Sequence, residues 1–213
     1  MDAIVDAFAK AGIFLGSPKV YLVISLVGLL TPYRTVFLRC AVLTLFTIIY
    51  NVYLKSIWQV PLPAPLEGWA FPSGHMHTAV VFWGWLAFEY KKLWSWTMSF
   101  FILCLCGYGL LFNVYHYPID IVGSVGFGTL SIFLYALLNK TPAFKKQPAL
   151  NGILLFLVSA VILLKLPTYA LKPHLWNAFA GLGVLACAWV IVALNSQRMD
   201  LMRSSVAQPT LEE

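Results

Sequence analysis

Two short stretches of this sequence contain most of the side chains that could carry out chemistry. Residues 72–77 read Pro-Ser-Gly-His-Met-His, and residues 116–120 read His-Tyr-Pro-Ile-Asp. Both stretches lie at the edge of a long apolar run, where ionisable side chains are costly and therefore mark function. We predict that the two stretches form one catalytic site on one side of a membrane.

The first stretch predicts the start of a helix that can hold an anion. Ser73 is a natural N-cap residue. The free backbone N–H groups and the positive end of the helix dipole at such a position face a negatively charged ligand. Gly74 lets a ligand approach the backbone closely, and His75 adds a group that can exchange a proton. Together these residues predict a phosphate-binding helix start with an acid attached.

The second stretch predicts an oriented imidazole. His116 and Asp120 are four residues apart, a spacing that puts both side chains on one face of a helical turn. A carboxylate that accepts from one imidazole nitrogen leaves the other nitrogen as a base or a nucleophile. We assign His77 and Tyr117 to a supporting role beside the site or to headgroup contact. We assign His174 to the membrane interface.

The composition predicts that membrane-spanning helices must position these residues. The chain has 213 residues, of which 61% are hydrophobic and 10% charged, whereas soluble domains carry roughly 25% charged residues. We therefore expect an all-α polytopic transmembrane bundle of about six to seven spans, each needing about 20 apolar residues. The net charge of +6 is no signal for nucleic acid, because the basic residues are scattered at the ends of apolar runs. The expected partners are the lipid bilayer and a membrane lipid substrate. The sequence does not reveal the oligomeric state.

The apolar runs predict seven spans in one transmembrane domain, residues 1–198, with the motif core at 55–128 and a polar cytoplasmic tail at 199–213. Residues 1–11 are expected to be a short amphipathic lead-in without a removable signal peptide. Residues 55–71 are expected to be a long loop, because they hold three prolines and a glycine. The expected spans are residues 12–30, 36–54, 73–90, 93–113, 118–138, 150–166 and 175–194.

The distribution of basic residues predicts which way the chain crosses the membrane. With seven spans, the loops alternate sides, and nine lysines and arginines fall on the side of the C-terminus against five on the other. The positive-inside rule then puts the C-terminus in the cytoplasm and both motifs at the outer face. We expect an integral protein of a bacterial inner membrane, with its site facing the periplasm or, in another organism, a lumen. The side of the C-terminus carries Arg34, Arg39, Lys91, Lys92, Lys140, Lys145, Lys146, Arg198 and Arg203, and the other side carries Lys10, Lys19, Lys55, Lys165 and Lys172.

The combination of Pro-Ser-Gly-His at 72–75 with His-x3-Asp at 116–120 resembles the type-2 phosphatidic acid phosphatase superfamily, which includes vanadium haloperoxidases and lipid phosphate phosphatases. The family pattern is Lys-x6-Arg-Pro, then Pro-Ser-Gly-His, then Ser-Arg-x5-His-x3-Asp. The resemblance implies a catalytic set in which His116 is the nucleophile that forms a phosphohistidine, Asp120 orients it, and His75 protonates the leaving group. It also implies that Ser73, Gly74 and Lys55 bind the phosphate.

Two positions depart from this pattern. Leu62 and Leu110 stand where the family has arginines, so both guanidinium groups that clamp the phosphate are missing there. Without them, a phosphate monoester dianion loses its strongest charge-assisted hydrogen bonds. A phosphodiester carries one charge fewer and needs less. The run 116–120 also resembles the His-Tyr-x-x-Asp of sphingomyelin synthases, which favours transfer of a phospho-headgroup over plain hydrolysis.

Three functions therefore stay open. The leading hypothesis is a lipid phosphotransferase or phosphatase that works at the outer face by double displacement, with neither metal nor other cofactor. Within it, a plain lipid phosphate or isoprenoid (di)phosphate phosphatase is the alternative to headgroup transfer. The second hypothesis is a metal or haem membrane protein with ligands from His75, His77, His116 and Asp120. The third is a non-catalytic relative that binds or transports lipid, which the missing arginines motivate.

Overall fold

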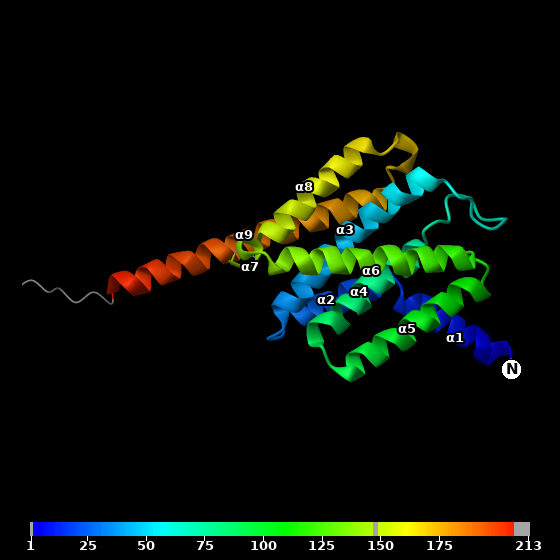
Figure 1. The fold of residues 1–213 in the computed structure, drawn as a ribbon, viewed down its shortest axis with the longest axis horizontal. Helices are drawn as coiled ribbons and strands as arrows, with labels where there is room; N and C mark the ends of the chain where they lie inside the picture. The colour runs from blue at the N-terminus through cyan, green and yellow to red at the C-terminus, as the bar shows by residue number, and fades with distance from the viewer. Residues whose placement is uncertain (1, 147–148, 207–213) are drawn as a thin grey trace, which may run out of the picture.

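The computed structural model describes the backbone of residues 2–146 and 149–206, and this part of the chain is helical throughout, with connecting loops and no strand. Figure 1 shows the helices gathered into one bundle, from which the C-terminal half of the last helix projects. The helices are α1 (Asp2–Leu15), α2 (Pro18–Leu29), α3 (Arg34–Trp58), α4 (Gly74–Tyr90), α5 (Leu93–Phe112), α6 (Pro118–Lys140), α7 (Pro142–Lys146), α8 (Ala149–Lys165), the 3₁₀ turn η1 (Thr168–Ala170) and α9 (Pro173–Val206).

The expected all-α transmembrane bundle is confirmed. Within the described residues, four helices are long and apolar enough to cross a membrane: α3, α5, α6 and the segment Pro173–Ile191 of α9. The pair α1 and α2, bent by 55° at its break, would make a fifth span. The bend falls at Gly16 and Ser17, directly before Pro18 at the start of α2. The remaining expected spans correspond to α4 and α8, which have 17 residues each.

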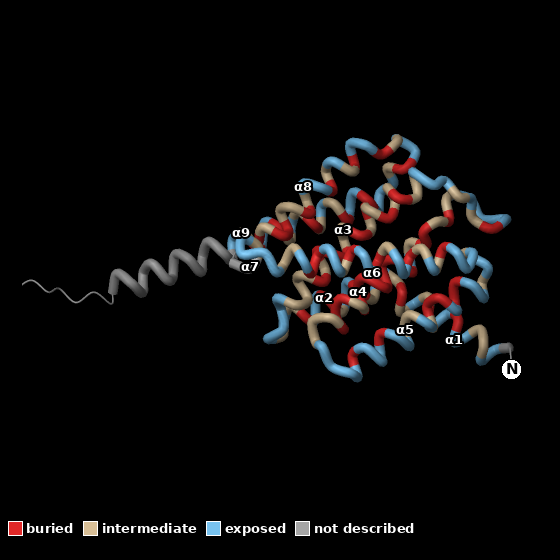
Figure 2. Tube along the Cα trace, in the orientation of Figure 1, coloured by how far each residue is buried: buried red, intermediate tan, exposed pale blue. Residues whose placement is uncertain are grey.

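The helix α4 lies at the centre of the bundle. It packs against α3, α5 and α6, and most of its residues are buried (Figure 2). A helix that is apolar on all faces is stable only when neighbours cover it on every side. The first turn of α4 carries the motif at 72–77, so this buried position fixes where that motif points.

Two helix ends differ from the sequence prediction. Helix α3 continues to Trp58, because Gln59 adopts the left-handed C-cap conformation at φ 48° and donates its N–H to the carbonyl of Lys55. Lys55 therefore belongs to the last turn of α3 and not to the loop. At the other end of the chain, α9 continues to Val206, through the first part of the expected tail. The rest of that tail, residues 207–213, lies outside the described residues.

The segment before the second helix also differs from its prediction. Residues 1–11 were expected to be a short lead-in, but α1 runs to Leu15 and packs along α5. Small residues allow the two backbones to touch. A Cβ atom on Gly12 would collide with the carbonyl of Leu105, and one on Gly109 would collide with the carbonyl of Ala9. This is the close approach by which small residues let membrane helices pack.

The packing of α1 on α5 predicts that a glycine-to-alanine change alters the thermal midpoint differently at two positions. Gly12→Ala should lower the thermal midpoint of the detergent-solubilised protein, because the new methyl group overlaps the backbone of α5. Gly126→Ala should leave the midpoint unchanged or raise it, because no atom lies within 4 Å of the new Cβ and alanine favours a helix by about 1 kcal/mol. The check is fluorescence-detected size exclusion after heating. Equal midpoints for the two variants would contradict the packing.

Candidate functional site

The first motif forms the N-terminus of α4. Ser73 caps the helix with extended backbone at φ −61° and ψ 124°, and its hydroxyl accepts from the N–H of Met76 at 3.4 Å. In the described part of the chain, the N–H groups of Gly74 and His75 donate to no backbone oxygen. The first N–H groups of a helix have no intrahelical partner. Two donors therefore stay free at this end, and the side chain of His75 is exposed beside them.

The second motif holds its histidine and aspartate in contact at the start of α6. The Nδ1 atom of His116 lies 3.2 Å from Oδ2 of Asp120, and the side chains are 8% and 0% exposed. The same carboxylate oxygen accepts from the N–H of Tyr117 at 2.8 Å. The pairing engages Nδ1 and leaves Nε2 as the second imidazole nitrogen. The side chain of Tyr117 is exposed and takes no part in this contact.

The two motifs touch directly. The N–H of Ser73 donates to the carbonyl of Asp120 at 3.3 Å. The hydroxyl of Ser124 lies between the same two residues, at 2.9 Å from the carbonyl of Ser73 and 2.6 Å from that of Asp120. All three residues are fully buried. The N-termini of α4 and α6 therefore meet at one end of the bundle, the end where α3 finishes (Figure 1).

Sequence reasoning missed Ser124. Its only signal was the spacing of four from Asp120, which puts both residues on one face of α6. Serine is common inside membrane helices, where its hydroxyl bonds the carbonyl four residues earlier. The additional bond to Ser73 depends on the packing of α4 against α6 and has no mark in the sequence.

A second missed residue, Asn51, supports the site from α3. Its side-chain Nδ2 donates to the carbonyl of Pro72 at 3.3 Å and lies 3.1 Å from Nδ1 of His77. Because the amide nitrogen is a donor, we assign Nδ1 of His77 as the acceptor. His77 is fully buried, on the opposite side of the α4 turn from the exposed His75. The supporting position expected for His77 therefore agrees with its burial against Asn51.

Lys55 contributes positive charge and a structural bond. Its ammonium group donates to the carbonyl of Trp69 at 2.6 Å and so ties the end of α3 to the loop that leads into α4. Burial lowers the pKa of His116 below its usual value, and the Lys55 charge lowers that pKa further, against the opposing influence of Asp120. Burial also lowers the pKa of His75, and the charge of Lys55 lowers it further. One cation therefore acts on both histidines of the candidate site.

Leu62 and Leu110 stand at the positions where the family has arginines, and neither supplies a positive charge. Leu62 belongs to the loop between α3 and α4, where its N–H donates to the carbonyl of Gly68 at 3.1 Å. Leu110 is 1% exposed and belongs to the apolar core. A second cation instead comes from the connection between α8 and α9, where the charge of Lys172 acts on Lys55.

The connection that carries Lys172 is attached to the C-terminal end of α3. The amide of Gln59 donates to the hydroxyl of Tyr169 at 3.1 Å, and Leu171 packs in an apolar cluster with Val52 and Tyr53. Burial lowers the pKa of His174, and the charges of Lys172 and Lys55 lower it further. The sequence placed Lys172 and His174 only at the flank of a span, since nothing local links that flank to α3.

A metal or haem site would need several ligand side chains that converge on one point. Among the side chains that the structure describes, those of residues 3–144 and 149–191, no group of three or more histidines, cysteines, aspartates or glutamates is arranged to hold a metal ion. The contact between Nδ1 of His116 and Asp120 occupies one imidazole nitrogen with a carboxylate.

The link between the motifs predicts different effects for the same substitution at two serines of α6. Ser124→Ala should lower the thermal midpoint more than Ser131→Ala, because only Ser124 contacts a carbonyl of another segment. Leaving a buried group without its partner costs about 1–3 kcal/mol. Ser131 bonds only the carbonyl of Phe127 in its own helix, and it therefore controls for the loss of a hydroxyl. Equal midpoints would show that the Ser73 contact contributes nothing to stability.

A comparison with protein families finds a match to this region of the chain. The family model that matches is described as the PAP2 superfamily, and it covers residues 41–144. No curated protein and no solved structure matches the chain. The matched segment contains both motifs, Lys55, Asn51 and Ser124, whereas Lys172 lies outside it. The resemblance seen in the sequence is thus supported at the level of the superfamily: residues 41–144 of this chain match the PAP2 superfamily.

Proposed function

We propose that this protein is an integral membrane enzyme that transfers a phospho-headgroup from a lipid phosphate ester through a covalent phosphohistidine at His116. The observation that carries the proposal is the contact between Ser73 and Asp120. It puts the free N–H groups of a helix N-terminus beside an imidazole that is paired with a buried carboxylate. An anion-binding helix start next to an oriented nucleophile is the arrangement that phosphoryl transfer requires.

The first half of the reaction assigns a role to each residue. The Nε2 atom of His116 attacks phosphorus, while Asp120 holds Nδ1 and stabilises the positive charge that forms on the ring. The bond from phosphorus to the leaving oxygen breaks, and the exposed His75 gives that oxygen its proton. The free N–H groups of Gly74 and His75, together with Lys55, face the charge on the phosphoryl oxygens.

The second half of the reaction releases the group from the enzyme. The hydroxyl of a lipid acceptor, or water, attacks phosphorus and gives its proton to His75. The bond from phosphorus to Nε2 of His116 breaks, and the neutral imidazole returns. The two acceptors share every step and differ only in which hydroxyl enters the site.

Charge favours a diester donor over a monoester. Lys55 and Lys172 are two cations at this end of the bundle whose charges act on each other, and Leu62 and Leu110 supply none. A lysine is a compact point charge and lacks the paired donors with which arginine holds a phosphate dianion. A phosphodiester, with a single negative charge, fits this weaker cation set. Plain hydrolysis of lipid or isoprenoid phosphates is the second candidate. It is favoured by the two lysines, because they supply positive charge in place of the missing arginines.

The proposed setting is the outer face of a bacterial inner membrane, with the C-terminus in the cytoplasm. Several helices long and apolar enough to cross a bilayer fit an integral membrane protein. The excess of lysine and arginine on the side of the C-terminus supports this orientation. Both motifs lie at the opposite end of the bundle, where a lipid headgroup and its acceptor are accessible.

The test of this function separates transfer from hydrolysis. Purified protein in liposomes is given phosphodiester lipids with a lipid hydroxyl acceptor and, separately, phosphatidic acid and isoprenoid phosphates, all with chelator present. We expect a new headgroup-bearing lipid without free phosphate, and loss of at least 1,000-fold in rate for His116→Ala because the covalent step disappears. Lys10→Ala, an exposed change in α1, is the control.

Three other outcomes of this test have distinct meanings. Phosphate release from the monoesters would identify the phosphatase alternative. Full activity of the His116→Ala protein would exclude the phosphohistidine mechanism. Tight lipid binding without turnover of any substrate would favour the non-catalytic relative.

The lowered pKa of His116 predicts the acidic limb of the pH profile. The nucleophile must be neutral, and a lowered pKa keeps it neutral as the pH falls through the ordinary histidine value of 6.5. Activity that depends on His116 should therefore be lost only at lower pH, where the ring is protonated. Lys55→Met removes one cause of the lowered pKa and should move this limb to higher pH. Lys10→Met should leave it in place. A limb that stays fixed or moves to lower pH in the Lys55 variant would contradict the electrostatic coupling.

A further inference from the structure

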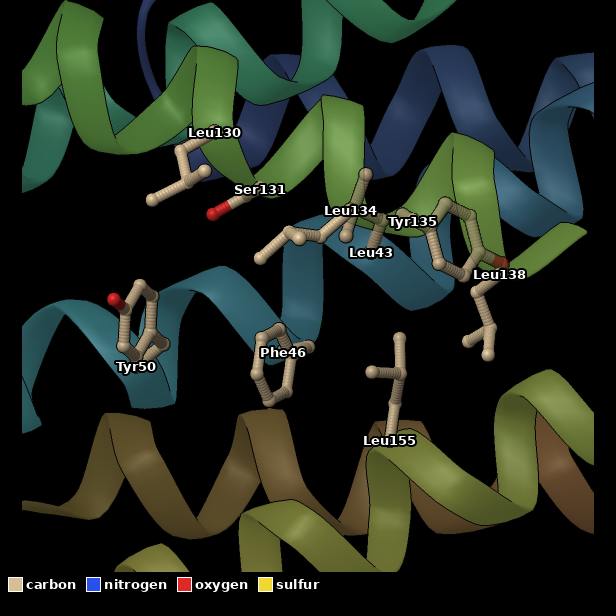
Figure 3. A pocket seen from close by; sticks show the side chains of 9 residues that line it. All are labelled: Leu43, Phe46, Tyr50, Leu130, Ser131, Leu134, Tyr135, Leu138 and Leu155. Atoms are coloured by element: carbon tan, nitrogen blue, oxygen red, sulfur yellow. The ribbon is translucent and has the colours of Figure 1, made fainter.

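A cavity of about 390 Å³ lies between α3, α6 and α8, and the residues that line it are different from those of the candidate site. Figure 3 shows its walls, with α6 on one side and α3 and α8 on the other. Phe46 and Tyr50 line it from α3, Leu130 and Leu134 from α6, and Leu155 from α8. Hydrocarbon side chains therefore form most of its surface.

The chemistry of the walls excludes a polar ligand from the middle of the cavity. The hydroxyl of Ser131 is already bonded to the carbonyl of Phe127 at 2.9 Å. A water molecule needs two to four polar partners to be held in a cavity, and this surface offers few. An apolar space of this size within a bundle of membrane helices is favourable for a hydrocarbon chain, which loses nothing by leaving the bilayer.

The cavity begins beneath the candidate site. The ring of Tyr50 meets that of His77 edge to face, with ring centroids 6.0 Å apart, and Asn51 follows it in the chain. At a rise of about 1.5 Å per residue, Tyr50 lies about 8 Å along α3 from Lys55. By the same measure, Leu130 lies about 15 Å along α6 from Asp120. A chain attached to a phosphate at the site would reach this space as it runs into the membrane.

An aromatic side chain and then a polar layer border the far end of the cavity. Tyr135 is 3% exposed, packs against Trp85 with ring centroids 4.8 Å apart, and has a hydroxyl with no hydrogen-bond partner among the described residues. Beyond it, Asn139 donates to the carbonyl of Tyr135 at 2.7 Å and accepts from Asn151 at 2.8 Å. This polar layer ends the apolar space about 27 Å along α6 from Asp120, at Leu138.

We propose that the cavity between α3, α6 and α8 binds one hydrocarbon chain of the lipid substrate, and that the polar layer of Asn139 and Asn151 beyond Leu138 limits the length of chain that is accepted. The cavity would then select the tail of the lipid, while the motifs at the end of the bundle act on its phosphate. This proposal rests on the proposed function for the identity of the lipid, but the binding of a chain can be measured without turnover.

The first experiment maps the occupant directly. Purified protein in liposomes is irradiated with phosphatidic acid that carries a photoreactive diazirine at the end of one 16-carbon chain, and the labelled residues are identified by mass spectrometry. We expect labels on the cavity faces of α3, α6 and α8, and loss of most of that label in Leu134→Trp, which fills the space. Leu137→Trp is the matched control, because it makes the same change on the same helix. Leu137 is exposed, as Leu134 is, but it does not line the cavity.

The second experiment uses the activity. For a long-chain substrate, Leu134→Trp should raise KM roughly tenfold, because the chain loses its van der Waals contacts with the cavity wall. The kcat for a donor with chains of about six carbons, too short to reach Leu134, should be unchanged. Leu137→Trp should change neither.

The outcomes keep the two proposals apart. Labels spread evenly over the lipid-facing surface of all spans, unaffected by Leu134→Trp, would overturn the chain-binding cavity whether or not the protein is active. Labels in the cavity without turnover of any donor would support the cavity and count against the proposed enzyme. Equal loss of label in both tryptophan variants would also overturn the proposal, because the effect would not depend on filling this space.

Discussion

The contact between the N-termini of α4 and α6 is the interaction on which the candidate site depends. The N–H of Ser73 donates to the carbonyl of Asp120, and the hydroxyl of Ser124 lies between the two segments. The first motif lies about forty residues before the second, and each is only half of a site. Because the direct contact joins backbone atoms of buried residues, the fold holds the relative position of the two motifs, and the buried Ser124 hydroxyl adds a second link.

The position of the site inside a largely apolar bundle explains the polar residues around it. A buried polar group costs free energy unless it is hydrogen-bonded. Asn51 satisfies both the carbonyl of Pro72 and the ring of His77, and Asp120 accepts from His116 and from the backbone of Tyr117. These supporting residues belong to α3 and α6, the helices that flank α4. The neighbours of α4 therefore stabilise the polar end of an otherwise apolar helix.

The same two flanking helices connect the two ends of the proposed substrate path. Helix α3 carries Lys55 and Asn51 at one end and the wall of the cavity further along, and α6 carries Asp120 and then Leu134 in the same order. A lipid is amphipathic, so its phosphate and its chain need neighbouring polar and apolar environments. Two continuous helices that pass from one environment to the other meet this need without any separate domain.

The sequence by itself determined the class of the fold and the two motifs, because both depend on local information. Apolar length predicts a helix wherever it occurs, and each expected span lies in a helix or, for residues 12–30, in the bent pair. Likewise the spacing of His116 and Asp120 already places them on one helical face. The helix ends were less accurate, since Gln59 and its left-handed backbone decide where α3 stops.

Only the tertiary structure decided which distant residues meet. Ser124, Asn51 and Lys172 act on segments at least twenty residues away, and a serine, an asparagine or a lysine carries no mark of its partner in the sequence. The cavity is likewise a property of three helices whose side chains fail to fill the space between them. Hydropathy reports the preference of each residue for lipid or water, whereas these contacts and gaps depend on how the side chains of several helices fit together.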